Sequence, residues 1–257
     1  MKVKIKTALV SVSDKTGLEE LVGCLAKHNI QIISTGGTSK AIQELGVNVN
    51  DVASITNFPE MMDGRVKTLH PNIHGGLLAK RDNDDHKNSQ KEHGIQDIDL
   101  VVVNLYPFEE TINSGSNEEK CIENIDIGGP AMLRSAAKNH QFVTVVSDNN
   151  DYQDIISELD KNDGSTTLEF RKKLAAKTYA TTAQYDTLIS NWFLKDSDEL
   201  TTNFSSPGTL SSELRYGENP HQSAGIYKSS FQKSGIPYAD LIQGKELSYN
   251  NINDADA

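Results

Sequence analysis

An uninterrupted apolar run at residues 100–103, Leu-Val-Val-Val, constrains the fold of this chain more than any other stretch. A strand with one wet face alternates apolar and polar side chains, whereas a parallel strand buried on both faces is apolar throughout. Residues 142–146, Phe-Val-Thr-Val-Val, predict another buried strand, and helical patterns surround both, including a long one over residues 168–193. Strands that alternate with helices predict the α/β class, with a doubly wound, mostly parallel sheet.

Polar motifs follow the predicted strands directly. The pattern predicts strands over residues 3–12, 30–34 and 47–52, a helix over 17–28 and another helix that ends at Leu45. Ligands of doubly wound sheets bind outside the carboxyl ends of the strands. We therefore expect the polar motifs at 11–17, 34–38 and 104–107 to share one rim of the sheet.

Composition changes near the end of the chain. Residues 196–212 are rich in Ser, Thr, Asp and Glu and contain Pro207-Gly208, which predicts a linker between a domain over 1–195 and a segment over 213–257. About 45 residues are marginal for an independent domain. The expectation is that residues 213–257 are the start of a second α/β domain in a longer protein.

The overall charge narrows the classes of partner. The 257-residue chain has a formal net charge of -11, which disfavours binding to a nucleic-acid backbone or to anionic lipid.

No window of the sequence approaches ~18 apolar residues, so no membrane span is expected. The two cysteines, Cys24 and Cys121, suggest no disulfide framework and fit a reducing cytoplasm.

Arg65 and Lys67 are two residues apart, between Gly64 and Pro71. In an extended chain, side chains at i and i+2 point the same way, so a guanidinium and an ammonium would share one face. Two neighbouring cations repel each other unless an anion lies between them, which predicts an anion site. Taken alone, the same pair would fit a solvated basic edge.

A glycine pair at Gly36-Gly37, between Thr35 and Thr38, follows the second predicted strand. Glycines let the backbone approach a phosphate, and the N–H groups that open the next helix point at it. The alternative is a tight turn with Thr38 as the helix cap. The loop with the polar residues Ser11, Ser13, Asp14, Lys15 and Thr16 is open to the same two interpretations, a phosphate site or helix capping.

Asp126 lies just before a second glycine pair, Gly128-Gly129, and Pro130 fits the first position of a helix that runs to Lys138. Free N–H groups at that helix start could cradle an oxyanion. The alternative is that Asp126 only caps the helix. Lys138 lies ~12 Å along the helix from Pro130, and its alternative role is that of a cation near the helix C-terminus.

Three further side chains are candidate ligand contacts. The phenol of Tyr106 follows a buried strand and either donates to a ligand or packs under the loop as a rim aromatic. His70 and His74 are four residues apart, but Pro71 intervenes and no third ligand lies nearby in the sequence. No metal site is expected.

Six motifs occur together in the order typical of one enzyme family: residues 11–17, 34–38, 64–71, 104–107, 126–129 and 136–140. The chain thereby resembles the IMP cyclohydrolase domain of bifunctional purine biosynthesis proteins. Residues 214–222 resemble the opening motif of the second domain of that family, the AICAR transformylase. The resemblance implies a methylglyoxal-synthase-like α/β fold and closure of 5-formamido-imidazole-4-carboxamide ribotide (FAICAR) to IMP with loss of water.

The resemblance also implies site residues. The catalytic set is Lys67, Tyr106, Asp126 and Lys138. The substrate and phosphate contacts are Ser11, Ser13, Lys15, Thr16, Thr35, Gly36, Gly37, Thr38, Arg65, Thr68, Asn104, Leu105, Ile127, Gly128 and Gly129. Whether Lys138 acts in its own subunit is left open, since the family forms homodimers.

For the transformylase, the resemblance places Arg215 and Tyr216 at the aminoimidazole substrate, with 10-formyltetrahydrofolate as co-substrate of the full-length protein. The cyclohydrolase is expected to need no cofactor and no metal. The catalytic Lys-His pair of the transformylase would lie beyond Ala257, so this chain is expected to close the ring but not to transfer formyl. Two other functions share the fold: a methylglyoxal-synthase-type lyase and a non-catalytic nucleotide-binding regulatory module.

Overall fold

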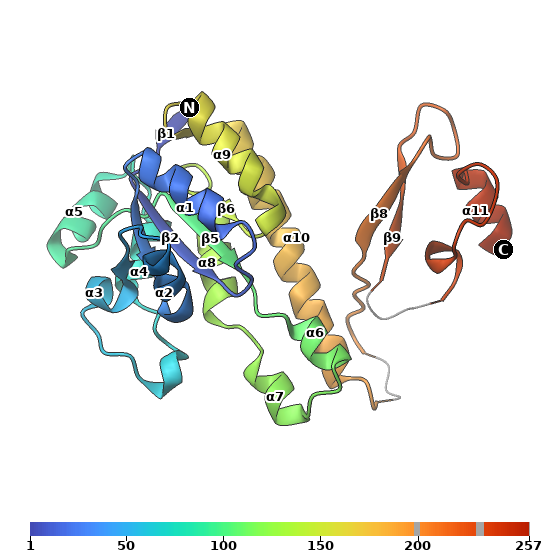
Figure 1. Cartoon of the computed structure of the whole chain (residues 1–257), viewed down its shortest axis with the longest axis horizontal. Helices are drawn as coiled ribbons and strands as arrows, with labels where there is room; N and C mark the ends of the chain where they lie inside the picture. Colours follow the sequence, from blue (N-terminus) through green and yellow to red (C-terminus); the bar gives the residue numbers. More distant parts are fainter. Residues whose placement is uncertain (198–200, 230–233, 257) are drawn as a thin grey trace. The chain divides into compact units, whose positions relative to one another are not determined.

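The computed structural model describes residues 1–197, 201–229 and 234–256 (Figure 1). It divides into two compact units, Met1–Thr182 and Ala183–Ala257. The division falls inside a long helix, α10 (Leu168–Phe193). The predicted domain boundaries at 195 and 213 stay a prediction. Residues 198–200 of the predicted linker lie outside the described residues.

The first unit is built on a five-stranded parallel sheet with the order β4-β3-β2-β5-β6. The strands are β2 (Thr7–Val12), β3 (Gln31–Ser34), β4 (Asn50–Asp51), β5 (Leu100–Asn104) and β6 (Thr144–Val146). The chain winds outward from β2 through β3 to β4, returns to the other side of β2, and continues to β6. This confirms the doubly wound sheet and makes β2 the strand at which the winding reverses.

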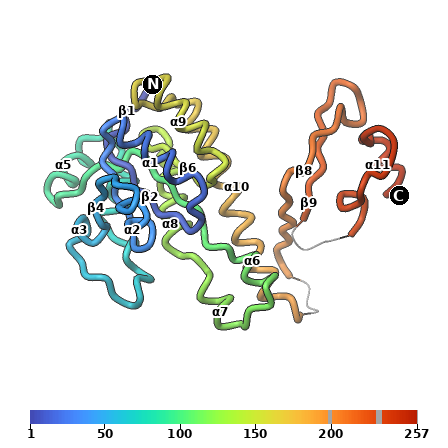
Figure 2. The backbone as a smooth tube through the Cα atoms, viewed as in Figure 1, coloured from blue at the N-terminus to red at the C-terminus, as the bar shows by residue number. Residues whose placement is uncertain are grey.

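Helices cover the sheet in two groups. One contains α1 (Leu18–Lys27), which contacts α2 (Gly36–Glu44) and α9 (Tyr152–Lys161); Figure 2 follows the backbone through α1 and these neighbours. In the other, α4 (Pro71–Leu78) contacts α8 (Gly128–Lys138), which packs on β5 and β6. Right-handed crossovers in opposite winding directions place helices on opposite faces, so both faces of the sheet are buried. The apolar run of β5 follows from that burial.

The other elements of this unit are short. They are the helices α3 (Val52–Thr56), α5 (Asp84–His93), α6 (Phe108–Asn113) and α7 (Glu118–Glu123), the 3-10 turns Met62–Gly64 and Asn149–Asp151, and the antiparallel pair β1 (Lys2–Lys4) and β7 (Ser165–Thr167). Arg171 of α10 is fully buried and donates to the carbonyls of His140, Gln141 and Thr166. These bonds satisfy the guanidinium and fix the start of α10 beside β7.

The structure corrects three predicted strands. The strand expected over 3–12 is two strands, because the Asp99 carboxylate accepts the N–H groups of Lys6 and Thr7 (2.7 and 2.9 Å), and β1 pairs with β7 outside the main sheet. The strand expected over 47–52 is reduced to β4, because the Asp51 side chain accepts the Ala53 N–H at 2.8 Å and starts α3. The strand expected over 142–146 begins only at Thr144.

The second unit contains an antiparallel hairpin of β8 (Thr209–Leu214) and β9 (Ala224–Lys228), a 3-10 turn at Ile236–Tyr238 and the helix α11 (Tyr249–Asp256). Residues 209–212, expected as part of the linker, therefore form a strand. The physical reason is pairing: Leu210 and Ser212 lie opposite Tyr227 and Ile226, with a register shift between them.

Candidate functional site

A cavity of about 630 Å³ lies in the first unit at the carboxyl ends of β2, β3 and β5, the rim on which the polar motifs were expected; we call it the rim cavity. Most of the predicted site residues line it: Ser11, Ser13, Lys15, Thr35, Gly37, Thr38, Arg65, Lys67, Thr68, Asn104, Tyr106, Asp126, Ile127, Gly128 and Gly129. The structure thus brings together segments far apart in the sequence.

Four of the residues predicted for the cyclohydrolase site do not line the rim cavity. Thr16 donates through its N–H and hydroxyl to Asp14 (2.9 and 2.7 Å), Leu105 packs against the core, and Gly36 faces a small adjoining recess. Lys138 is exposed in the last turn of α8, about 15 Å along the helix from Gly128. The structure therefore does not bring Lys138 into the site of its own chain.

Thr38 anchors the glycine turn at the start of α2 to the end of β2. Its buried hydroxyl bonds both the N–H and the carbonyl of Val12, each at 3.0 Å, so this predicted phosphate contact is used to fix the turn. Ser11 and Thr35 pair through their hydroxyls at 2.8 Å on the cavity wall. The backbone of Gly36 is left-handed, with φ of 37°. The turn thus presents two hydroxyls and the N-terminus of α2 to the cavity.

Asn104 fixes the neighbouring loop. Its side-chain oxygen accepts the N–H groups of Ser13 and Asp14 (2.6 and 3.1 Å), and its amide donates to the Asp14 carbonyl at 2.7 Å. The Lys15 ammonium reaches the Ser13 carbonyl at 3.4 Å. The Asn104 side chain therefore shapes the cavity wall by ordering the loop that carries Ser13 and Lys15.

The segment that carries Arg65 and Lys67 is not extended, which corrects the basis on which the two cations were expected to share a face. Gly64 is left-handed, with φ of 80°, Arg65 has helical angles, and the Lys67 N–H bonds the Gly64 carbonyl at 3.3 Å. The two cations take different partners: Arg65 pairs with Glu123, and the Lys67 ammonium lies 3.4 Å from Glu60. Both still line the rim cavity.

Asp126 is half-buried at the start of α8, where its carboxylate accepts the Gly129 N–H at 2.8 Å. Burial raises the pKa of Asp126 above its ordinary value, and backbone hydrogen bonds from Gly129 and Tyr106 partly oppose that shift. The capping expected as an alternative is therefore present. Because α8 begins at Gly128, Pro130 is its third residue and not its first.

Close contacts explain the second glycine pair. A side chain at Gly128 would place its Cβ 2.4 Å from the Thr68 hydroxyl, and one at Gly129 would place it 2.4 Å from the Asp126 carboxylate. Both positions need glycine so that these polar side chains can approach the helix start. Tyr106 is half-exposed and also lines the cavity.

Acidic residues of the site were missed in the sequence. Asp63 and Glu123 line the rim cavity, and Glu60 lies beside it against Lys67. No spacing rule links Glu123 to Arg65 across 58 residues, so only the fold reveals that pair. Glu60, seven residues before Lys67, had no periodicity to mark it.

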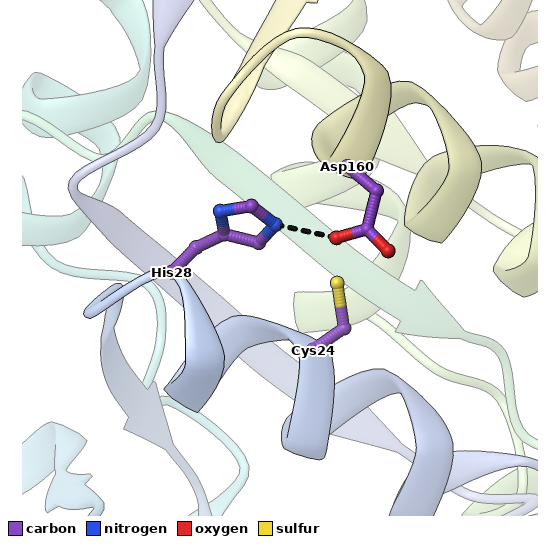
Figure 3. Close-up of side chains that lie close together, drawn as sticks. All are labelled: Cys24, His28 and Asp160. Carbon is purple, nitrogen blue, oxygen red and sulfur yellow. Dashed lines mark hydrogen bonds and ion pairs between the residues drawn. The ribbon is translucent and has the colours of Figure 1, made fainter.

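Within the described residues, one group of side chains has the composition of a metal site: Cys24, His28 and Asp160, whose potential ligand atoms lie within 4.8 Å of one another (Figure 3). Asp160 already accepts from His28 at 2.7 Å and from the Lys27 ammonium at 2.8 Å. Burial and Asp160 raise the pKa of the Cys24 thiol, which disfavours the thiolate that a metal needs. The group is best explained as polar contacts that join α1 to α9.

In the described part of the chain, none of the helices is both long enough and apolar enough to cross a bilayer.

Comparison with known protein families shows which domains this chain resembles. Residues 17–131 match the MGS-like domain family, and residues 136–257 match the family described as the AICARFT/IMPCHase bienzyme. The crystal structure of ForH superimposes with a TM-score of 0.64 at 33% sequence identity, covering 74% of this chain and 99% of that one.

Curated relatives define the family. The bifunctional purine biosynthesis proteins PurH of Bradyrhizobium diazoefficiens and Agrobacterium fabrum are 57% and 56% identical to this chain, over 99% and 100% of its length. The chain belongs to this PurH family of purine biosynthesis enzymes. It spans about half the length of the curated relatives it matches, 48% of each.

Proposed function

We propose that this chain closes the ring of FAICAR to form IMP. The carboxamide nitrogen attacks the formyl carbon of the same molecule, and a new N–C bond forms as the formyl oxygen becomes a hydroxyl. That hydroxyl then leaves as water with a proton from the ring nitrogen, which makes the ring aromatic. The supporting observation is that one cavity joins a glycine turn with neighbouring cations to a half-buried carboxylate.

The ribose 5-phosphate is assigned to the α2 end of the rim cavity. Gly37 and the N-terminus of α2 favour an anion there, and the Ser11 and Thr35 hydroxyls are placed to donate to it. Lys15 and Arg65 supply positive charge from neighbouring loops. Holding the phosphate fixes the orientation of the reacting groups. Such orientation removes a large part of the activation barrier of an intramolecular reaction.

The reacting groups are assigned to the α8 end. Asp126 takes the proton that leaves the carboxamide nitrogen, and its raised pKa makes it a better base than an exposed aspartate. Lys67 reaches in from the α2 side of the cavity and donates to the formyl oxygen as negative charge develops there. Tyr106 and the backbone at Gly128 stabilise the same oxygen. We also propose that the protein is a homodimer, and Lys138 enters this scheme only from a second copy of the chain.

The test is Lys67→Met, assayed by the IMP absorbance formed from FAICAR. We expect the rate to fall about 10²- to 10⁴-fold, the range for loss of a proton donor. Lys40→Met, which removes the same charge from the exposed surface of α2, should keep the wild-type rate. If Lys67→Met retains full activity, the assignment is wrong, and a wild-type chain that releases no IMP would favour the lyase or the regulatory module.

For the whole protein, we propose a second activity, formyl transfer from 10-formyltetrahydrofolate to AICAR. Arg215 and Tyr216 follow β8, with the guanidinium 5.9 Å from the tyrosine ring centre, and are assigned to that substrate. We also propose that the protein works in the cytoplasm, which fits its free cysteines.

A further inference from the structure

Both cations of the segment around Gly64 are neutralised by glutamates. Lys67 faces Glu60 and Arg65 faces Glu123, from α7. Neither glutamate belongs to the motif that carries the cations. Both glutamate side chains are exposed, that of Glu60 by 57% and that of Glu123 by 58%. Exposed ion pairs of this kind contribute little to stability, so a stronger partner can replace them.

The place of the Lys67 ammonium shows why it needs an anion. Side chains built at Gly36 and Gly64 would come within 3.3 and 3.0 Å of its nitrogen, so the ammonium lies against the start of α2. A helix N-terminus carries partial positive charge, which disfavours a cation there. Glu60 offsets that cost: its carboxylate would lie 2.4 Å from the same built position at Gly64.

We propose that Glu60 is an internal stand-in for the ligand, holding the Lys67 ammonium until a nucleoside monophosphate replaces it. Glu123 has the same role towards Arg65. This inference rests on the proposed function, since it takes the rim cavity to be the nucleotide site. A phosphate monoester carries more negative charge than one carboxylate and offers three acceptor oxygens, so the exchange favours the bound state. The competition also weakens the apparent affinity.

The test compares wild type with Glu60→Gln by titration calorimetry with IMP and, separately, with inorganic phosphate. Removing the competitor should tighten IMP binding about two- to fivefold, as expected from the free energy of an exposed ion pair. A gain with inorganic phosphate as well assigns Lys67 to the phosphate, and a gain with IMP alone assigns it to the base; both support the proposal. The gain should shrink at high salt.

Two controls isolate the contact. In a Lys67→Met background, Glu60→Gln should no longer change IMP affinity, because the cation for which it competes is gone. Glu119→Gln removes an equal charge from α7 at a position with no ion pair among the described residues, and should leave affinity unchanged. Melting by circular dichroism checks that each variant folds.

Weaker IMP binding by Glu60→Gln would overturn the proposal, since it would mean that Glu60 positions Lys67 for the ligand. Unchanged binding would overturn it as well. Either result leaves the proposed function standing if wild type binds IMP and closes the ring. A wild type that neither binds IMP nor closes the ring would remove the basis of both.

Discussion

Two glycine pairs open two helices on the rim cavity, and their electrostatic partners have opposite sign. Gly36-Gly37 starts α2 beside the Lys67 ammonium, whereas Gly128-Gly129 starts α8 beside the Asp126 carboxylate. At the start of α8, the partial positive charge of the helix N-terminus faces a negative group, because Asp126 accepts the Gly129 N–H. At the start of α2, the nearest charge is the positive Lys67 ammonium, and Glu60 supplies the negative charge.

The difference teaches what each turn does. A helix N-terminus with a cation beside it lacks an anion and is suited to receive one. A helix N-terminus that already carries its own carboxylate is partly neutralised, and in the proposed function it holds that carboxylate as the base. In the proposed function, similar sequence signals therefore serve a ligand site in one case and the support of a reactive group in the other.

Alanine substitutions should separate the two turns, and they carry the largest expected effect. In Gly129→Ala the new Cβ would lie 2.4 Å from the Asp126 carboxylate, which must swing away. Misplacing a reacting group by about 1 Å can cost about 10²-fold, so we expect kcat to fall by that factor with KM little changed. In Gly36→Ala the left-handed backbone and the nearby Lys67 should raise KM and cost about 1–2 kcal/mol of stability.

Steady-state kinetics on FAICAR and denaturant unfolding measure both variants. Gly23→Ala is the matched control, because a Cβ at this position of α1 meets open space. It should keep wild-type kinetics and gain up to about 1 kcal/mol from helix propensity. If both cavity variants change kcat and KM alike, the two turns do not differ in role.

Much of this fold follows from local pattern. The apolar run of β5 predicts its burial, and the motifs after β2, β3 and β5 predict the rim, because parallel strands end at one edge. The geometry around Arg65 could not be predicted, since the left-handed Gly64 turns the chain out of the extended form. The pairing with Glu123 depends on tertiary packing of α7, which no local spacing encodes.

The carboxylate of the α8 turn should also leave a signature in the pH dependence of stability. Burial raises the folded-state pKa of Asp126 above 3.8, so the folded chain keeps a proton that the unfolded chain has released. The free energy of unfolding therefore falls as pH rises from 3.8 through the folded pKa, and the loss persists at higher pH. Asp126→Asn removes this contribution.

We therefore expect the stability of Asp126→Asn, relative to wild type, to be greatest near neutral pH and to decrease on acidification. Calorimetric melting at a series of pH values measures it, and the other carboxylates cancel because they titrate in both proteins. Lys40→Met, on α2, should show no such pH-dependent difference in this range. Parallel stability curves for Asp126→Asn and wild type would contradict the burial of a charged group in this turn.

The smallest effect is expected at the far end of α8. Lys138 lies in the last turn, exposed, while the first turn lines the rim cavity. If it acts only as a cation near the helix C-terminus, Lys138→Ala should cost about 0.3–1 kcal/mol of stability, and less at high salt.

The rate of ring closure by Lys138→Ala in a monomeric sample should then stay within about twofold of wild type, because removing an exposed group that touches no substrate leaves the barrier nearly unchanged. Kinetics at protein concentrations below and above any self-association midpoint provide the measurement. A loss of rate confined to the associated form would place Lys138 in the site of a second copy, and an equal loss in the monomer would contradict the distance along α8 that separates it from Asp126.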